Sequence, residues 1–128
     1  MKTALRTLAL SALGMITLGC TPDYHTVRIE AESNPPAPVN IRGNRVELPT
    51  GIAVVIEADL VSRTREDYPG RGELELYSAD RDVFEVYPRP NHEEFVIVGI
   101  NPGSACMDVV VDGRQEDCID VTVTAAPI

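Results

Sequence analysis

The chain contains no tryptophan and only two histidines, His25 and His92. Without tryptophan, a flat aromatic platform for stacking sugar rings is not expected. Neither histidine has a nucleophile in a recognisable arrangement. Ser62, Ser78 and Ser104 lack the Gly-x-Ser-x-Gly context of a hydrolase nucleophile, and no glycine-rich loop precedes a helix to hold a phosphate. These absences predict a protein that is not an enzyme and uses no cofactor.

Metal ligands in a recognisable spacing are also missing. The segment His92-Glu93-Glu94 holds three potential ligands, but neighbouring strand residues point to opposite faces, so these would converge only in a turn. Asp80-Arg81-Asp82 offers oxygen ligands to calcium, yet the EF-hand spacing is absent. We expect His92 to lie in a solvated loop and Asp80 to bind the backbone amides of a turn. No metal site is therefore predicted.

Basic residues are scarce beyond the first few positions. After residue 19, the chain has nine basic residues, all arginine, against 20 acidic residues, which gives a net charge of −11. Such an acidic surface repels nucleic-acid phosphates and anionic lipid headgroups. We therefore expect no nucleic-acid partner, and solubility in the cell envelope is the simplest explanation of the charge.

Only one long apolar run is present. Residues 7–18 form an apolar segment of 12 residues, whereas a transmembrane helix needs about 20. Lys2 and Arg6 precede the run, and Gly19 and Cys20 end it before the chain becomes polar. This pattern is typical of an export signal. It resembles the bacterial lipoprotein signal, in which cleavage precedes a cysteine that receives lipid. An ordinary secretory signal cleaved nearby is the alternative.

The resemblance implies that residues 1–19 are a cleaved helical signal peptide and that Cys20 carries lipid, with acyl chains such as palmitate on its sulfur and amino group. Thr17 and Leu18 depart from the leucine and small residue that are usual before the Gly-Cys pair. Thr21 after the cysteine, rather than aspartate, implies transfer to the outer membrane. Several acyl chains anchor a protein stably, so we expect the membrane to be a partner through Cys20.

The chain has three cysteines, an odd number for an exported protein. If lipid occupies Cys20, Cys106 and Cys118 remain, and two cysteines in an oxidising compartment predict one disulfide. Their separation of 12 residues excludes a Cys-x-x-Cys redox motif and a zinc knuckle. Two free thiols are the alternative.

Short alternating or β-branched segments fill the rest of the chain. Strands are expected at residues 24–31, 41–48, 52–61, 72–77, 83–86, 94–100, 105–111 and 118–124. The prolines of residues 33–38 predict an extended connector, and residues 62–72 and 87–92 predict loops. No helix is expected after the signal. About seven short strands separated by turns predict an all-β sandwich.

Three segments in order resemble bacterial immunoglobulin-like domains of the group 2 type, which are repeated in intimin-like and invasin-like adhesins: "SADRDVFEV", "FVIVGINPGSACMDVVVDG" and "CIDVTV". Gly99, Gly103 and Ala105 match the family's Val-x-Gly-x-x-x-Gly-x-Ala stretch. The resemblance covers about residues 46–123 and implies an Ig-like β-sandwich. Leu76 stands where the family has a core tryptophan and should still face inward. Gly99 inside a strand predicts a bulge or a close backbone contact.

The last two expected strands form a hairpin with an apolar inner face. The expected core residues of the domain are Leu74, Leu76, Val83, Val98, Met107, Val109, Ile119 and Val121. Cys106 and Cys118 fall on the opposite, polar face, and directly opposed residues share a face. Pairing the cysteines directly puts Asp112 at the centre of a three-residue loop, with Gly113 in the left-handed conformation. A longer loop stays open.

The expected domains are residues 1–19, the signal peptide; residues 20–40, the lipid attachment cysteine, a tether and a candidate edge strand; and residues 41–128, the sandwich.

We expect a non-catalytic binding or structural module, anchored in the cell envelope at the outer membrane, with an envelope protein as partner. Tyr68 and Tyr87, in or beside loops, are the candidate binding-loop residues. The alternatives are an accessory subunit of a periplasmic or outer-membrane assembly that pairs through an edge strand and, last, an enzyme or small-molecule carrier.

Overall fold

The computed structural model describes residues 24–62, 72–91 and 93–126, and it contains no helix in these ranges. The strands are β1 (Tyr24–Ala31), β2 (Asn40–Arg42), β3 (Arg45–Pro49), β4 (Ala53–Ser62), β5 (Leu74–Ser78), β6 (Phe84–Pro88), β7 (Glu94–Gly99), β8 (Gly103–Val111) and β9 (Arg114–Thr124). Accordingly, the part of the chain that is described has no helix of the length and hydropathy needed to span a bilayer.

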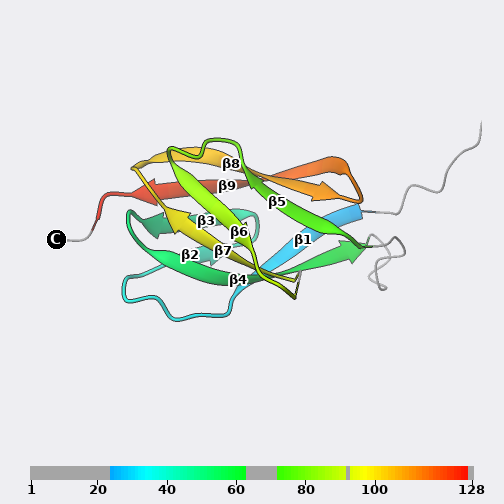
Figure 1. Ribbon diagram of the computed structural model, residues 1–128, viewed down its shortest axis with the longest axis horizontal. Coiled ribbons are helices and arrows are strands. Elements are labelled where there is room, and N and C mark those ends of the chain that lie inside the picture. Colours follow the sequence, from blue (N-terminus) through cyan, green and yellow to red (C-terminus); the bar gives the residue numbers. More distant parts are fainter. Residues whose placement is uncertain (1–23, 63–71, 92, 127–128) are drawn as a thin grey trace, which may run out of the picture.

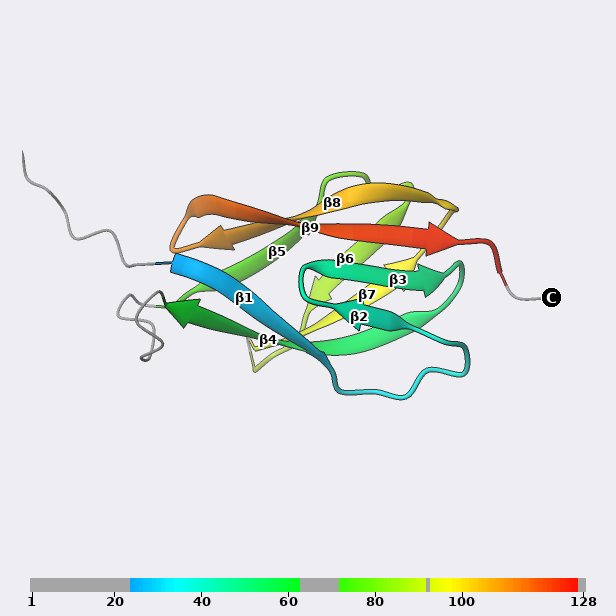
Figure 2. The same cartoon turned by 180° about the vertical axis from the view of Figure 1, so that it is seen from behind.

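The strands form two packed sheets (Figures 1 and 2). One sheet has four strands in the order β1-β4-β7-β6, and the other has five in the order β2-β3-β9-β8-β5. Strand β3 pairs in parallel with β9, whereas the other pairs are antiparallel. The start of β1 and the turn between β8 and β9 lie at one end of the molecule, opposite the C-terminal end of β9 (Figure 1). The predicted all-β sandwich is confirmed.

Both sheets direct alternate side chains into one hydrophobic core. Five of the expected core residues are buried in it: Leu76, Met107, Val109, Ile119 and Val121. Leu74 and Val83 are partly buried and pack against the same core. Leu76, which stands where the resembled family has a core tryptophan, is only 4% exposed and does face inward.

Val98 is not a core residue, and that prediction is wrong. In β7, Phe95, Ile97 and Gly99 are buried, whereas Val96 and Val98 face outward and are half-buried. Both faces of this strand are apolar, so alternation alone does not decide which side points inward. The pairing of β7 between β4 and β6 fixes the choice, and it leaves valines on the outer face of the sheet.

The extended segment expected at residues 41–48 is two strands rather than one. A tight turn between Arg42 and Arg45 folds β2 back on β3, and Arg42 pairs directly with Arg45. Gly43 makes the turn possible because its φ of 58° lies in the left-handed region that side chains disfavour. This turn is one reason why the fold has more strands than the sequence predicts.

Gly99 lies where two backbones approach closely, as predicted. A Cβ atom at this position would be 2.6 Å from the carbonyl oxygen of Pro49 and 3.2 Å from the Val123 side chain. The Gly51 N–H also donates to the Gly99 carbonyl oxygen at 2.8 Å. Only a glycine leaves room for β3 and the following turn to lie against the end of β7.

The hairpin of β8 and β9 has the predicted face pattern but a different register. Val111 pairs with Arg114 across a two-residue turn, in which Asp112 and Gly113 have φ values of 49° and 82°. The predicted three-residue loop is therefore wrong, although Gly113 is left-handed as expected. A bulge at Glu116 shifts the register by one residue. This shift restores the apolar inner face that a two-residue turn alone would have mixed with the outer one.

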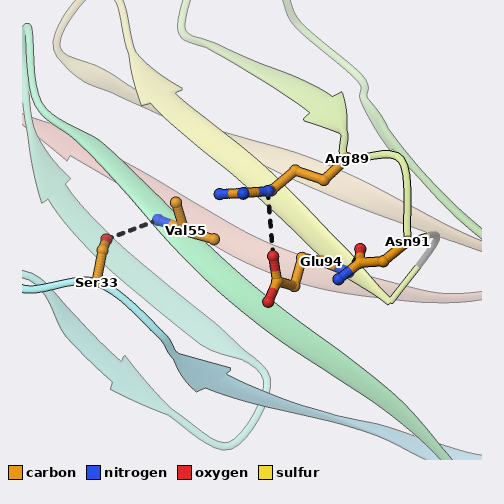
Figure 3. A network of polar contacts seen from close by, with 5 residues as sticks. All are labelled: Ser33, Val55, Arg89, Asn91 and Glu94. Carbon is orange, nitrogen blue, oxygen red and sulfur yellow. Dashed lines mark hydrogen bonds and ion pairs between the residues drawn. The ribbon is translucent and has the colours of Figure 1, made fainter.

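Strand β1 forms one edge of the four-stranded sheet, within residues 20–40, and pairs with β4. Its Val27 and Ile29 side chains enter the core. Where the chain leaves this sheet, the Val55 N–H donates to Oγ of Ser33 at 2.9 Å (Figure 3). A side-chain oxygen thus replaces a backbone acceptor just before the prolines. Residues 34–39 then carry the chain to β2 in the other sheet.

Candidate binding surfaces

Cys106 and Cys118 form a disulfide on the outer face of the five-stranded sheet, with a Cα–Cα distance of 5.5 Å. The two residues are not directly opposed. Cys106 pairs with Asp120, and Cys118 pairs with Asp108, so the bridge joins diagonal neighbours on one face. Both cysteines are half-buried. The bridge fastens β8 to β9 beside the bulged part of the hairpin.

Three residues singled out from the sequence, Cys20, Tyr68 and His92, lie outside the described residues. The other expected binding-loop residue, Tyr87, is the fourth residue of β6 rather than part of a loop, and its side chain is 45% exposed. It pairs with Val96 of β7, which places it on the outer face of the four-stranded sheet. The structure therefore gives Tyr87 a place on a sheet surface.

The acidic segments behave as turn residues where the structure describes them. The carboxylate of Asp80 accepts a hydrogen bond of 3.0 Å from the Asp82 N–H, as predicted for a turn. The Glu94 N–H donates to Oδ1 of Asn91 at 3.1 Å, and Arg89 Nε lies 3.1 Å from Oε2 of Glu94 across the hairpin of β6 and β7 (Figure 3). The described residues contain no group of three or more metal ligands close enough together to hold an ion.

A row of three glutamates crosses the outer face of the four-stranded sheet. Glu30 of β1 pairs with Glu57 of β4, and Glu57 also pairs with Glu94 of β7. We call these three residues the acidic row. Directly opposed like charges destabilise a sheet, and Arg89 offsets only the charge of Glu94.

Further acids surround the acidic row. A hydrogen bond with Glu32, together with repulsion from Asp59, Glu32 and Glu93, raises the pKa of Glu57. Arg28 lies opposite Asp59 in the next pair of β1 and β4 that faces outward. The row and its neighbours therefore form a strongly negative part of the surface.

An apolar row lies next to the acidic one. Val96 of β7 pairs with Val55 of β4 on one side and with Tyr87 of β6 on the other. We call Val55, Val96 and Tyr87 the apolar row. The two valines are half-buried, and Val98 continues the apolar surface one step further along β7. Sequence reasoning missed both rows, since each joins β4 to β7, and these two strands are far apart in the chain.

The outer face of the five-stranded sheet has a different character. A hollow of about 560 Å³ lies over β2, β3, β8 and β9, and Arg42, Arg45, Glu47 and Asp120 line it. Hydroxyl groups complete it, with Ser104 Oγ and Thr122 Oγ1 3.0 Å apart. This hollow is polar and of mixed charge.

A smaller groove of about 320 Å³ runs between β5 and β6, at the edges of the two sheets. Leu74, Leu76, Val86 and Phe95 line its apolar part. Tyr77, on β5, is 52% exposed and donates a hydrogen bond to Glu75, which raises the pKa of Tyr77. Tyr77 was not among the binding residues expected from the sequence, although its place in the strictly alternating segment, directly after Leu76, predicts an outward side chain.

No family model matches the chain, and no curated protein matches it. Solved structures of S-layer protein domains do resemble it. Domains 1–6 of the surface layer protein SbsC match 84% of the chain with a TM-score of 0.57 and 13% sequence identity. Domains 5–6 of the same protein match 81% with a TM-score of 0.57 and 13% identity. Domains 4 and 5 match 72% with a TM-score of 0.53 and 15% identity.

The likeness is one of fold. The chain spans 14%, 45% and 54% of the three SbsC chains, which is less than two thirds of each. The chain is thus similar in fold to part of a multidomain surface layer protein.

Proposed function

We propose that the protein is a non-catalytic module of the cell envelope, held to the outer membrane by lipid on Cys20, and that its sandwich binds or supports another envelope protein. The observation that carries this proposal is the likeness of the sandwich to S-layer domains over 72–84% of the chain. Domains of this kind in the similar structures belong to a surface layer protein.

The position of β1 supports the anchoring part of the proposal. The strand begins at Tyr24, only four residues after Cys20. A chain segment of this length spans at most about 14 Å. Lipid on Cys20 would therefore hold the end of the sandwich with the β8–β9 turn close to the membrane surface, and the faces of both sheets would stay open to partners.

A subunit of a periplasmic or outer-membrane assembly is the second candidate, and the sheet edge favours it. Strand β1 pairs with β4 on one side and forms the edge of its sheet on the other. Among the residues that the structure describes, one row of its backbone donors and acceptors is therefore available for strand addition by a partner. The eight residues of β1 give that edge a useful length.

Fractionation and crosslinking of cells that produce the full chain test the proposal. We expect the wild-type protein in the outer-membrane fraction, crosslinked in a fixed ratio to one envelope protein. A Cys20→Ser variant should fold but leave the membrane fraction. Recovery of the wild-type protein as a soluble, uncrosslinked species would contradict the proposal. Labelling of intact cells then separates the surface face from the periplasmic face.

A further inference from the structure

The acidic row on the outer face of the four-stranded sheet destabilises the fold through repulsion between like charges, and no other contact among the described residues requires it. Glu30, Glu57 and Glu94 lie in directly opposed positions on three strands. Within the described part of the chain, neither Glu30 nor Glu57 has an ion pair, whereas Glu94 pairs with Arg89 at 3.1 Å. A sheet face that served only to be solvated would be more stable with cross-strand charges of opposite sign. Like charges held together on one face, two of them without an ion pair, instead suit a positively charged partner.

The apolar row makes the same face suitable for more than a simple ion. Val55, Val96 and Tyr87 lie directly beside the acidic row, two residues further along β4 and β7. Tyr87 is 45% exposed, and it is one of two large apolar side chains exposed to this extent in the described chain. Aromatic and apolar side chains next to charge are typical of protein interfaces. The partner must therefore supply both positive charge and apolar surface.

A second copy of the chain does not fit this description. Two acidic rows would repel each other if two such faces met. The other outer face, over the five-stranded sheet, has Arg42 and Arg45, but Glu47 and Asp120 lie among them and hydroxyl groups occupy the neighbouring positions. The residues that line this hollow therefore offer no apolar row to cover Val55 and Val96. Anionic lipid and nucleic acid are also repelled by the acidic row.

We propose that this face binds an extended segment of another protein in which a lysine or arginine stands two residues from a β-branched apolar residue, with a second apolar residue two positions beyond. This inference rests on the proposed function of the protein as a binding module. The spacing follows from strand geometry, because residues two apart on one face are about 6.6–7 Å from each other. A strand laid along β4 would place its basic side chain over Glu57 and its apolar side chains over Val55 and Ala53, whose partners on β7 are Val96 and Val98.

The test uses the mature chain, residues 20–128, with Cys20→Ser so that it is purified without lipid, at low salt with a chelator present. The probe is a synthetic peptide in which one arginine and then two valines stand two positions apart, with threonine at the positions between them. One comparison peptide has glutamate in place of arginine, and another has serine in place of valine. Calorimetry should show that the arginine–valine peptide binds about tenfold more tightly than either comparison, because charge-assisted contacts and apolar burial each contribute on this scale.

Variants locate the binding face. Glu57→Gln and Val96→Thr should each weaken binding about fivefold or more, since one removes the central charge and the other the central apolar group. Glu47→Gln and Val110→Thr are the matched controls, because they make the same changes on the outer face of the five-stranded sheet. These two variants should bind as the wild type does. Glu57→Gln should also melt no lower than the wild type, which separates lost binding from lost folding.

Three outcomes would overturn the inference. They are equal binding of the three peptides, an equal loss of binding in Glu47→Gln and Glu57→Gln, and self-association of the wild-type chain that Val96→Thr abolishes. Because the assay contains no membrane, absence of lipid on Cys20 would refute the proposed anchoring without affecting this result. A negative peptide result would, in turn, leave the anchoring intact.

Discussion

The Tyr24 hydroxyl donates a hydrogen bond of 3.0 Å to Oδ2 of Asp117, and this bond joins the first strand of one sheet to the last strand of the other. Tyr24 is half-buried, and burial together with its bond to Asp117 raises its pKa well above the usual range for tyrosine. The phenol therefore stays protonated and keeps its donor at any physiological pH. This contact closes the sandwich at the end that begins four residues after Cys20.

Replacing Tyr24 by phenylalanine should lower the free energy of unfolding by about 1 kcal/mol, the usual net contribution of one hydrogen bond. Urea denaturation monitored by circular dichroism measures the change. Tyr77→Phe is the control because Tyr77 is 52% exposed and bonds only to Glu75 of its own strand. That variant should change stability by less than about 0.5 kcal/mol. Equal effects of the two substitutions would show that the bond between the sheets adds nothing.

Leu76 and Leu74 provide a matched pair for the core. They lie two residues apart on β5 and face the same way, but Leu76 is buried and Leu74 is only partly buried. Leu76→Ala should lower the free energy of unfolding by about 2–5 kcal/mol because it leaves a cavity in the core. Leu74→Ala should cost clearly less. If Leu74→Ala instead lowers the free energy of unfolding more than Leu76→Ala does, Leu76 is not central to the core of this fold.

Reduction of the Cys106–Cys118 bridge should lower the stability of the domain while the sheets remain. The bridge closes a loop between residues 12 apart in the sequence. In the chain-entropy model, such a loop lowers the entropy of the unfolded chain and so stabilises the folded domain by about 3 kcal/mol. Thermal denaturation with and without reductant, followed by far-ultraviolet circular dichroism, measures the loss. A thiol assay on unfolded, unreduced Cys20→Ser protein should detect no free cysteine. Detection of two would mean that the bridge does not form in the protein.

The stability of the domain should depend on pH through Glu57. Its folded-state pKa is raised above the ordinary value of 4.5, first by the hydrogen bond with Glu32 and then by repulsion from Asp59. The contribution of this group to stability is therefore fully present below pH 4.5 and is lost as the pH rises through the raised pKa. Glu57→Gln should gain melting temperature relative to the wild type as the pH rises from about 5 to 7. Glu47→Gln controls for the loss of one negative charge. If the difference in melting temperature between Glu57→Gln and the wild type does not change with pH, Glu57 is not the source of the pH dependence.

Sequence reasoning predicted what depends on local pattern. Alternation in β5 and β9 identified buried residues because only one face of each strand is apolar, and the same parity put both cysteines on one outer face. It failed for Val98, since both faces of β7 are apolar and the neighbouring strands decide which one is inside. Register was also beyond local reasoning, because the bulge at Glu116 changes the pairing without changing the pattern.

The candidate binding face could not be predicted from the sequence for a related reason. Glu30, Glu57 and Glu94 are unremarkable in the sequence, where acids are numerous, and they become one row only when β1, β4 and β7 lie side by side. Tyr87 could be identified as an exposed aromatic residue, and Val96 pairs with it within one hairpin, but the place of Val55 beside them depends on strand order. Strand order between distant segments is a tertiary property that periodicity does not encode.

The most direct test of the central claim is mass spectrometry of the N-terminal peptide of the mature protein, isolated from the membrane fraction of the producing cells. We predict that the mature chain begins at Cys20 and that this residue carries lipid on its sulfur and amino group. A mature protein that begins at another residue, with Cys20 absent or unmodified and the chain in the soluble fraction, would contradict it.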